Sequence, residues 1–202
     1  MTETNEAGRR AFLRDGLLVL SGALGGSFCS AALLKGTAPR VVAAQPASGA
    51  EARLKALGIE LPPAQKPIAV YVPAVRVGNL LFVSGTGPMK ADGTMIRGKV
   101  GGDLSLADGY AAARLVGLNT LRTVQNTLGS LDGVVRLVKV LGMVNCVPTF
   151  GEQPKVINGF SELMVQIFGE QNGKAARSAV GMGSLPSNIP VEIESIFEVR
   201  PV

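Results

Sequence analysis

The segment of residues 191–199 constrains the fold more than any other part of the chain. Side chains of a β-strand point alternately to the two faces of a sheet. In this segment one face receives Val191, Ile193, Ser195, Phe197 and Val199, and the other receives Glu192, Glu194, Ile196 and Glu198. A strand with one apolar face and one charged face belongs to a sheet covered on one side, and helices must supply that cover.

Two segments have the apolar spacing of helices that lie on a sheet. The first is predicted over residues 105–129, with Ser105 as N-terminal cap, Asp108 in a capping-box position and Gly129 as the stop. Its predicted apolar face consists of Ala111, Leu115, Leu118, Leu121, Val124 and Leu128. The second is predicted over residues 153–168, with Pro154 in its first turn. Its predicted buried face consists of Val156, Phe160, Leu163, Ile167 and Phe168.

Short strand signals fill much of the remaining chain. Further strands are predicted at residues 69–71, 74–76, 80–83, 134–144 and 178–182, with turns at Gly78-Asn79, 91–93 and Asn172-Gly173 and a helical patch at 51–57. The order β-β-(β)-α-β-α-β-β predicts the α+β class: a two-layer sandwich in which two helices cover one face of a mixed sheet. The other face, if apolar, needs cover from a second subunit, so we expect an oligomer.

Composition excludes several classes of chemistry. The 202 residues include no histidine and two cysteines, so no metal site and no catalytic triad are expected. Phosphate-binding glycine loops are absent from the sequence as well, and we expect no cofactor. The formal charge is +5, but residues 1–44 hold 5 of the 20 basic and 3 of the 15 acidic residues, which leaves 15 − 12 = +3. These charges are scattered, so nucleic-acid binding is not expected.

The first 44 residues have the order of an export signal. Arg9 and Arg10 precede Phe12 and Leu13, and a weakly apolar stretch follows over residues 17–34. This order resembles a twin-arginine (Tat) signal peptide, with a small-residue cleavage site at residues 42–44. A membrane anchor or an ordinary soluble helix is the alternative, although glycines and serines weaken insertion. We therefore expect an exported, periplasmic protein without stable membrane insertion after cleavage; recovery from the cytoplasm of cells with intact Tat machinery would contradict this.

Cleavage would remove Cys29 and leave Cys146 alone, so no intrachain disulfide is expected. Residues 45–66 are rich in Ala, Pro and Gln and are predicted to be a linker and N-terminal extension. The folded domain is predicted over residues 67–202.

Three stretches resemble the RidA (YjgF) family, also described as endoribonuclease L-PSP. They are Tyr71 followed by Gly78-Asn79, the strand end Phe82-Val83-Ser84-Gly85, and residues 176–194 with the sequence ARSAVGMGSLPSNIPVEIE. The resemblance covers about residues 60–201, and the last stretch is its most specific part. It implies a fold like that of chorismate mutase and a homotrimer with clefts between subunits. Other details resemble a less characterised branch of the family.

The resemblance also implies an enamine/imine deaminase, which hydrolyses 2-imino acids to 2-oxo acids and ammonia. Arg177 would bind the substrate carboxylate, because a guanidinium donates two parallel hydrogen bonds to it and stays charged. Glu192 would hold or activate the water. The predicted substrate-binding residues are Tyr71, Ser84, Gly85, Arg177, Ser178 and Ala179.

Other interpretations remain open at this stage. Arg177 beside strand glutamates is also compatible with a structural ion pair, and Tyr71 and Ser84 with structural roles. Position 179 is alanine where the main deaminases often carry cysteine, which puts the substrate range in doubt. The rival function is a non-catalytic module that binds a small carboxylate or a protein. Ribonuclease activity is a weaker option, since no residue pattern supplies acid–base chemistry around a phosphate.

Overall fold

The structure, a computed structural model, describes residues 49–64 and 69–201. The twin-arginine segment and its cleavage site lie outside the described residues. Within the described ranges no helix is both long enough and apolar enough to cross a membrane.

Five strands form one mixed sheet in the order β1-β2-β5-β3-β4. The strands are β1 (Ala74–Val77), β2 (Leu80–Thr86), β3 (Val134–Asn145), β4 (Ala176–Met182) and β5 (Val191–Val199). Neighbouring strands run antiparallel except β3 and β4, which are parallel. A parallel pair needs a crossover connection, and the helix between β3 and β4 supplies it. The mixed sheet and the α+β class agree with the prediction.

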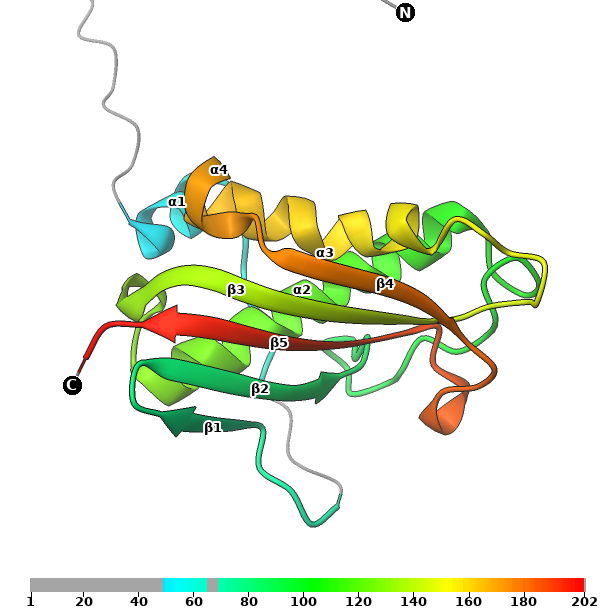
Figure 1. The fold of residues 1–202 in the computed structure, drawn as a ribbon, viewed down its shortest axis with the longest axis horizontal. Coiled ribbons are helices and arrows are strands. Elements are labelled where there is room, and N and C mark those ends of the chain that lie inside the picture. The colour runs from blue at the N-terminus through cyan, green and yellow to red at the C-terminus, as the bar shows by residue number, and fades with distance from the viewer. Residues whose placement is uncertain (1–48, 65–68, 202) are drawn as a thin grey trace, which may run out of the picture. The chain divides into compact units, whose positions relative to one another are not determined.

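Two long helices lie behind the sheet in the view of Figure 1, and two short ones lie near one end of it. They are α1 (Ala50–Ala56), α2 (Leu106–Leu128), α3 (Gln153–Phe168) and α4 (Glu170–Gly173). Single 3-10 turns, η1 (Leu131–Gly133) and η2 (Pro186–Asn188), precede β3 and β5. The predicted capping box is formed, since the Ser105 and Asp108 side chains each accept the other's backbone N–H, and Gly129 ends α2 in the left-handed conformation.

The buried face of α2 differs from the prediction. Leu121 and Val124 are buried as predicted, but Ala111 is exposed and Leu115, Leu118 and Leu128 are only half-buried. The centre of the face consists of small or short residues: Gly109, Ala112, Ala113, Val116, Gly117 and Thr120. The predicted face, which was chosen by its large apolar residues, is displaced from the true buried face. Small residues are required on the true face because α2 contacts a second helix closely there.

That second helix is α3, and glycines set its distance from α2. A Cβ built on Gly159 would lie 2.1 Å from the carbonyl oxygen of Tyr110, and one on Gly117 would lie 2.8 Å from Leu163. Backbone therefore meets backbone where the two helices cross. The predicted buried face of α3 is confirmed, since all five of its residues are buried.

Three local predictions were wrong. Residues 69–71 form no strand, because the Tyr71 N–H bonds to the Ala69 carbonyl in a tight turn. Residues Asn172-Gly173 belong to α4 rather than to a turn. Strand β4 begins at Ala176, two residues before its predicted start, because its pairing with β3 continues back to Lys139.

The two faces of the sheet differ as the alternation of β5 predicts. Val191, Ile193 and Phe197 are fully buried beneath the helices. The opposite face, called the open face below, has no helix over it among the described residues (Figure 1). This face exposes several large apolar side chains. Four of them are Val75, Val77, Phe82 and Val180, and Val77 is 61% exposed.

The helix crossing gives a test of how the two layers are held. Alanine is normally the better helix former by about 1 kcal/mol, yet Gly159→Ala places a methyl group against backbone that cannot rotate away. We expect the variant to lose about 3 kcal/mol of unfolding free energy in urea titration. Gly151→Ala is the control, because a Cβ there meets nothing within 4 Å. Equal stability of the two variants would contradict the close crossing.

Candidate functional site

Arg177 lies on β4, at the edge of the sheet, and faces helix α3. Its partner across the ladder is Val140, which is buried beneath the helices, so the two side chains share that face. The Arg177 Nη1 donates to Asn158 Oδ1 at 2.9 Å and to Ser161 Oγ at 3.0 Å. Both acceptors are neutral, and they stand three residues apart on one face of α3. The side chain is held in place without losing its charge.

No carboxylate of the described residues lies within ion-pair distance of Arg177. The ion pairs formed among the described residues join Lys155 to Glu152 and Lys174 to Glu170, and both pairs are exposed. Arg177 itself is exposed, and no further hydrogen bond from its guanidinium to a described residue is formed. Its remaining N–H groups can therefore receive an external carboxylate.

Ser178 and Ala179 lie on opposite sides of β4. Ala179 shares the α3 side with Arg177 and is half-buried against the core. Ser178 lies on the open face, where its hydroxyl accepts a hydrogen bond from Lys139 Nζ at 3.3 Å. Only one of the two predicted neighbours therefore accompanies Arg177.

Glu192 lies on the open face and is in contact with Gly85. Its ladder partner is Met143, and the residues on either side of it, Val191 and Ile193, are buried beneath the helices. A Cβ built on Gly85 would lie 2.1 Å from Glu192 Oε1, so the carboxylate occupies the space that a side chain at position 85 would need. The pairing of β2 with β5 is interrupted between Val83 and Thr86, and this bulge contains Gly85. Residues 84–85 thus do more than end a strand.

The surroundings of Glu192 disfavour its charged form. The pKa of Glu192 is raised above the usual carboxyl value, mainly by partial burial and to a smaller extent by the negative charge of Glu194. No hydrogen bond to its carboxylate from a described residue offsets this. A carboxylate with a raised pKa and no bonded donor is a better proton acceptor than an ordinary surface glutamate.

Ser84 and Tyr71 lie near the start of the sheet. The Ser84 hydroxyl donates to the Val72 carbonyl at 2.7 Å and so ties the segment before β1 to β2. Tyr71, in that segment, is 47% exposed, and its hydroxyl bonds to none of the described residues. Ser84 has a structural bond in addition to any role in binding.

Within one protomer the predicted site residues on the strands fall into two groups, one on each face of the sheet. Arg177 and Ala179 lie on the helix side of β4, whereas Ser84, Gly85, Glu192 and Ser178 lie on the open face. Arg177 and Glu192 are also separated by the width of β3. The chain brings Glu192 to Gly85 but does not bring Glu192 to Arg177.

Two depressions lie in this part of the described structure, and of the predicted site residues only Ser84 lines one of them. One, of about 300 Å³, lies on the open face between β1, β2, β5 and β3, with Phe82, Ser84, Lys139 and Glu194 among its walls. The other, of about 430 Å³, lies where β3 and β4 end, beside Lys99 and Cys146. Arg177 and Glu192 line neither of them. Over residues 49–64 and 69–201, no three His, Cys, Asp or Glu side chains cluster to hold a metal ion.

The polar partners of Arg177 were not assigned from the sequence. These partners are Asn158 and Ser161 on α3. Their spacing of three residues on a predicted helix placed them on one face. The sequence carries no signal that this face lies over β4, because that depends on the close crossing of α2 and α3.

Comparison with known proteins identifies the family. Residues 51–192 match the family described as "YjgF/chorismate mutase-like, putative endoribonuclease". The chain belongs to the YjgF family. The match includes all of α1 but its first residue, the two stretches within residues 71–85, and residues 176–192 of the third stretch, so the family predicted from these motifs is confirmed.

Individual YjgF-family relatives cover most of the folded region. TCP17 of Trypanosoma cruzi is 42% identical over 149 residues, which are 74% of this chain and 93% of that protein. The structure of Atu1372, a protein of unknown function from Agrobacterium tumefaciens, is 45% identical with a TM-score of 0.68 and covers 75% of this chain and 94% of its own. A 2-iminobutanoate/2-iminopropanoate deaminase of Dermatophagoides farinae is 29% identical over 143 residues, 70% of this chain and 95% of that protein.

The raised pKa of Glu192 makes stability depend on pH in a defined direction. A carboxyl group whose pKa is higher in the folded state stabilises the fold below its unfolded pKa, and that stabilisation is lost as pH rises through the folded value. We expect Glu192→Gln to melt at a higher temperature than the parent at pH 7, and the difference to vanish near pH 4, at about the ordinary carboxyl pKa.

Differential scanning calorimetry at the two pH values measures this difference. Glu60→Gln, at an exposed carboxylate outside the sheet, is the matched control and should show no such pH-dependent gain. A gain for Glu192→Gln that is the same at pH 7 and near pH 4 would rule out an unfavourable charge at this position.

Proposed function

We propose that the protein is an enamine/imine deaminase, which hydrolyses 2-imino acids to 2-oxo acids and ammonia. The observation that carries the proposal is the guanidinium of Arg177, held by two neutral side chains and without a carboxylate partner among the described residues. The relative from Dermatophagoides farinae, named as a 2-iminobutanoate/2-iminopropanoate deaminase, supports the same chemistry. Buried or fixed cations without counterions are typical of anion-binding sites.

The reaction needs little from the protein besides position and one base. Arg177 donates two parallel hydrogen bonds to the substrate carboxylate and so orients the neighbouring C=N carbon. Glu192 accepts a proton from water as the water oxygen adds to that carbon, and passes the proton to the imine nitrogen, which becomes an amine. Glu192 then takes the hydroxyl proton of the tetrahedral adduct and passes it to the amine nitrogen, and the C–N bond breaks to release ammonia as the C=O bond forms. The sum is imine plus water giving 2-oxo acid plus ammonia, with no oxidant or cofactor.

The separation of Arg177 from Glu192 within one protomer favours a site shared between subunits. The open face exposes Val75, Val77, Phe82 and Val180 together with charged residues, and apolar patches of this kind are typical of subunit contacts. A homotrimer in which one subunit contributes the arginine and another contributes the open-face residues would complete the cleft. The small-carboxylate substrate would then bind between protomers.

A non-catalytic carboxylate-binding module is the second candidate. The specific observation in its favour is that anchor and base lie on opposite faces of the sheet in each protomer. Ala179, which offers no thiol, is compatible with it, and so is the match to Atu1372, a protein of unknown function. Export through the twin-arginine route, which we also propose from Arg9 and Arg10, would separate the protein from cytoplasmic imines. Ligand-dependent thermal stabilisation without turnover would favour this candidate.

The role of Arg177 is tested by ammonia release from freshly generated 2-aminoacrylate. We expect Arg177→Ala to lower kcat/KM about 100-fold, since a bidentate charged hydrogen bond contributes about 3 kcal/mol. Arg177→Lys should recover only part of the loss, because lysine keeps the charge but not the fork. Arg136→Ala, at an exposed arginine on β3, is the matched control. Equal rates for Arg177→Ala and the parent would remove Arg177 from the reaction.

The shared site is tested by the mass of the protein in solution. We expect light scattering to give three copies per particle, and Phe82→Glu to give single copies, because a carboxylate on the open face cannot be buried between subunits without a partner. Leu57→Glu is the matched control, since Leu57 is an exposed apolar residue outside the sheet. A single-copy mass for the parent protein would contradict the shared site.

A further inference from the structure

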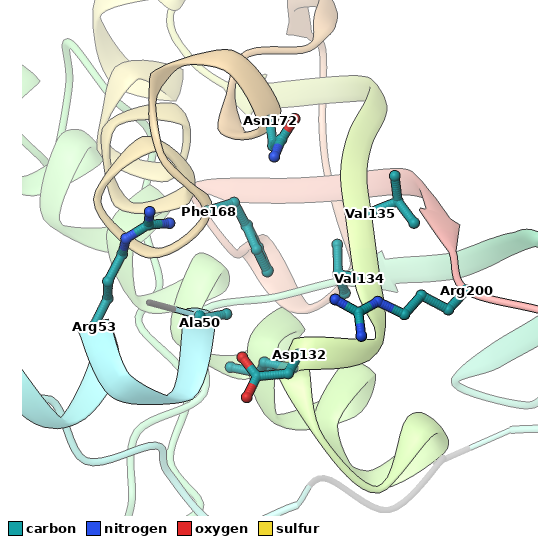
Figure 2. Close-up of a pocket in the computed structure, with 10 residues that line it drawn as sticks. Ala50, Arg53, Asp132, Val134, Val135, Phe168, Asn172 and Arg200 are labelled. Carbon is teal, nitrogen blue, oxygen red and sulfur yellow. The ribbon is translucent and has the colours of Figure 1, made fainter. Parts of the chain in front are cut away.

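A cavity of about 460 Å³ lies where α1, η1, the start of β3 and the ends of α3 and β5 meet (Figure 2). Its size is within the range of pockets that hold small organic ligands. Two arginines and one aspartate line it, Arg53, Arg200 and Asp132, and apolar side chains such as Phe168 and Val134 lie between them. None of the residues assigned to the deaminase site is among them.

Arg53 is fixed at one wall of this cavity. Its Nη1 donates to the Ile167 carbonyl at 3.2 Å, in the last turn of α3. The guanidinium lies over Gly169, where a Cβ would approach Nη1 to 3.3 Å. The other N–H groups of Arg53 bond to none of the described residues, so the charge is positioned but not neutralised.

Arg200 supplies the second cation from the opposite wall. Its backbone is held on both sides, since the N–H donates to Gly133 O at 2.9 Å and the carbonyl accepts from Arg76 Nη2 at 2.6 Å. Figure 2 shows its side chain turned inward toward Asp132 and Val134. The guanidinium has no hydrogen bond or ion pair with any described residue. A fixed backbone and an uncommitted guanidinium suit a ligand-binding side chain.

Asp132 sets the charge balance. Its Oδ1 accepts the Glu51 N–H at 3.2 Å and so fixes the first turn of α1. Neither arginine lies within ion-pair distance of it in the described structure. The three charged side chains leave a net charge of +1 in the cavity, which a single negative charge would neutralise. A second negative charge would lie close to Asp132 and be repelled.

Apolar side chains lie between these charged residues, beside Gly49 and Asn172. Phe168 and Val134 are almost fully buried, and Figure 2 shows the Phe168 ring directed into the space between the two arginines. Leu131 and Ala50 continue this surface, while Val135, 39% exposed, lies at the mouth. An apolar group of a ligand would be removed from water here.

We propose that this cavity binds a monocarboxylate with an apolar body, at a site separate from Arg177. The carboxylate bonds to the guanidinium group of Arg200, the positive charge of Arg53 on the opposite wall adds to its attraction, and the apolar part lies against Phe168 and Val134. One negative charge balances the cavity, whereas phosphate and dicarboxylates bring an excess that Asp132 repels. The site is independent of the deaminase proposal, because it uses other residues at the other end of β3.

The proposal is tested by calorimetric titration of the full chain with phenylacetate. We expect saturable binding that weakens about tenfold or more in Arg200→Ala, through loss of a charged hydrogen bond. Arg53→Ala should weaken it likewise, while Arg136→Ala leaves it unchanged. Arg177→Ala also leaves it unchanged, which separates this cavity from the proposed deaminase site. Loss of binding in Arg177→Ala with full binding in Arg200→Ala would overturn the assignment, as would no binding to the parent.

Charge selectivity gives a second measurement. The parent should bind phenylacetate more tightly than phenylsuccinate, and should not bind 2-phenylethylamine. Asp132→Asn keeps the oxygen that accepts the Glu51 N–H and removes the negative charge, so we expect it to reverse the preference toward phenylsuccinate. Tight binding of the amine, or an unchanged preference in Asp132→Asn, would show that these three charges do not select the ligand.

Discussion

The contact of α3 with α2 through Gly159 and Gly117 determines where the rest of the protein can lie. Because backbone meets backbone at this crossing, the distance between α2 and α3 is fixed. This distance places Asn158 and Ser161 over the edge strand β4, within hydrogen-bond distance of Arg177. It also places the last turn of α3 where the Ile167 carbonyl receives Arg53. Two fixed arginines, one at the middle of α3 and one at its last turn, thus depend on the same contact.

The elements of the fold could be predicted because their signals are local. The alternation in β5, the capping box at Ser105 and the apolar spacing of α3 each lie within a few residues, and each appears in the structure as the sequence indicates. The stripe on α2 was misplaced where glycine and alanine, which look unremarkable in a sequence, form the helix contact. The order of the strands depends on pairings between distant segments, so no local pattern indicated it, and the family resemblance implied only the type of fold.

The site could be predicted only in part, for a reason of the same kind. The family motifs predicted Arg177 and Glu192 as site residues. In the structure the Arg177 guanidinium has no carboxylate partner among the described residues. Which side of the sheet each faces follows from strand register and from bulges, and neither is visible in a motif. The cavity with Arg53, Asp132 and Arg200 had no sequence signal, because its charged residues come from three distant parts of the chain.

The contact between Gly85 and Glu192 links two positions that are more than a hundred residues apart in the sequence. A side chain at position 85 would displace the Glu192 carboxylate from its present place, so the two positions are coupled. A homologue in which the glutamate takes this place needs a glycine beside it, and one that has lost the glutamate is released from that requirement. The identity of the residue after Ser84 therefore indicates, from the sequence alone, whether a carboxylate at position 192 on the neighbouring strand has room in its present place.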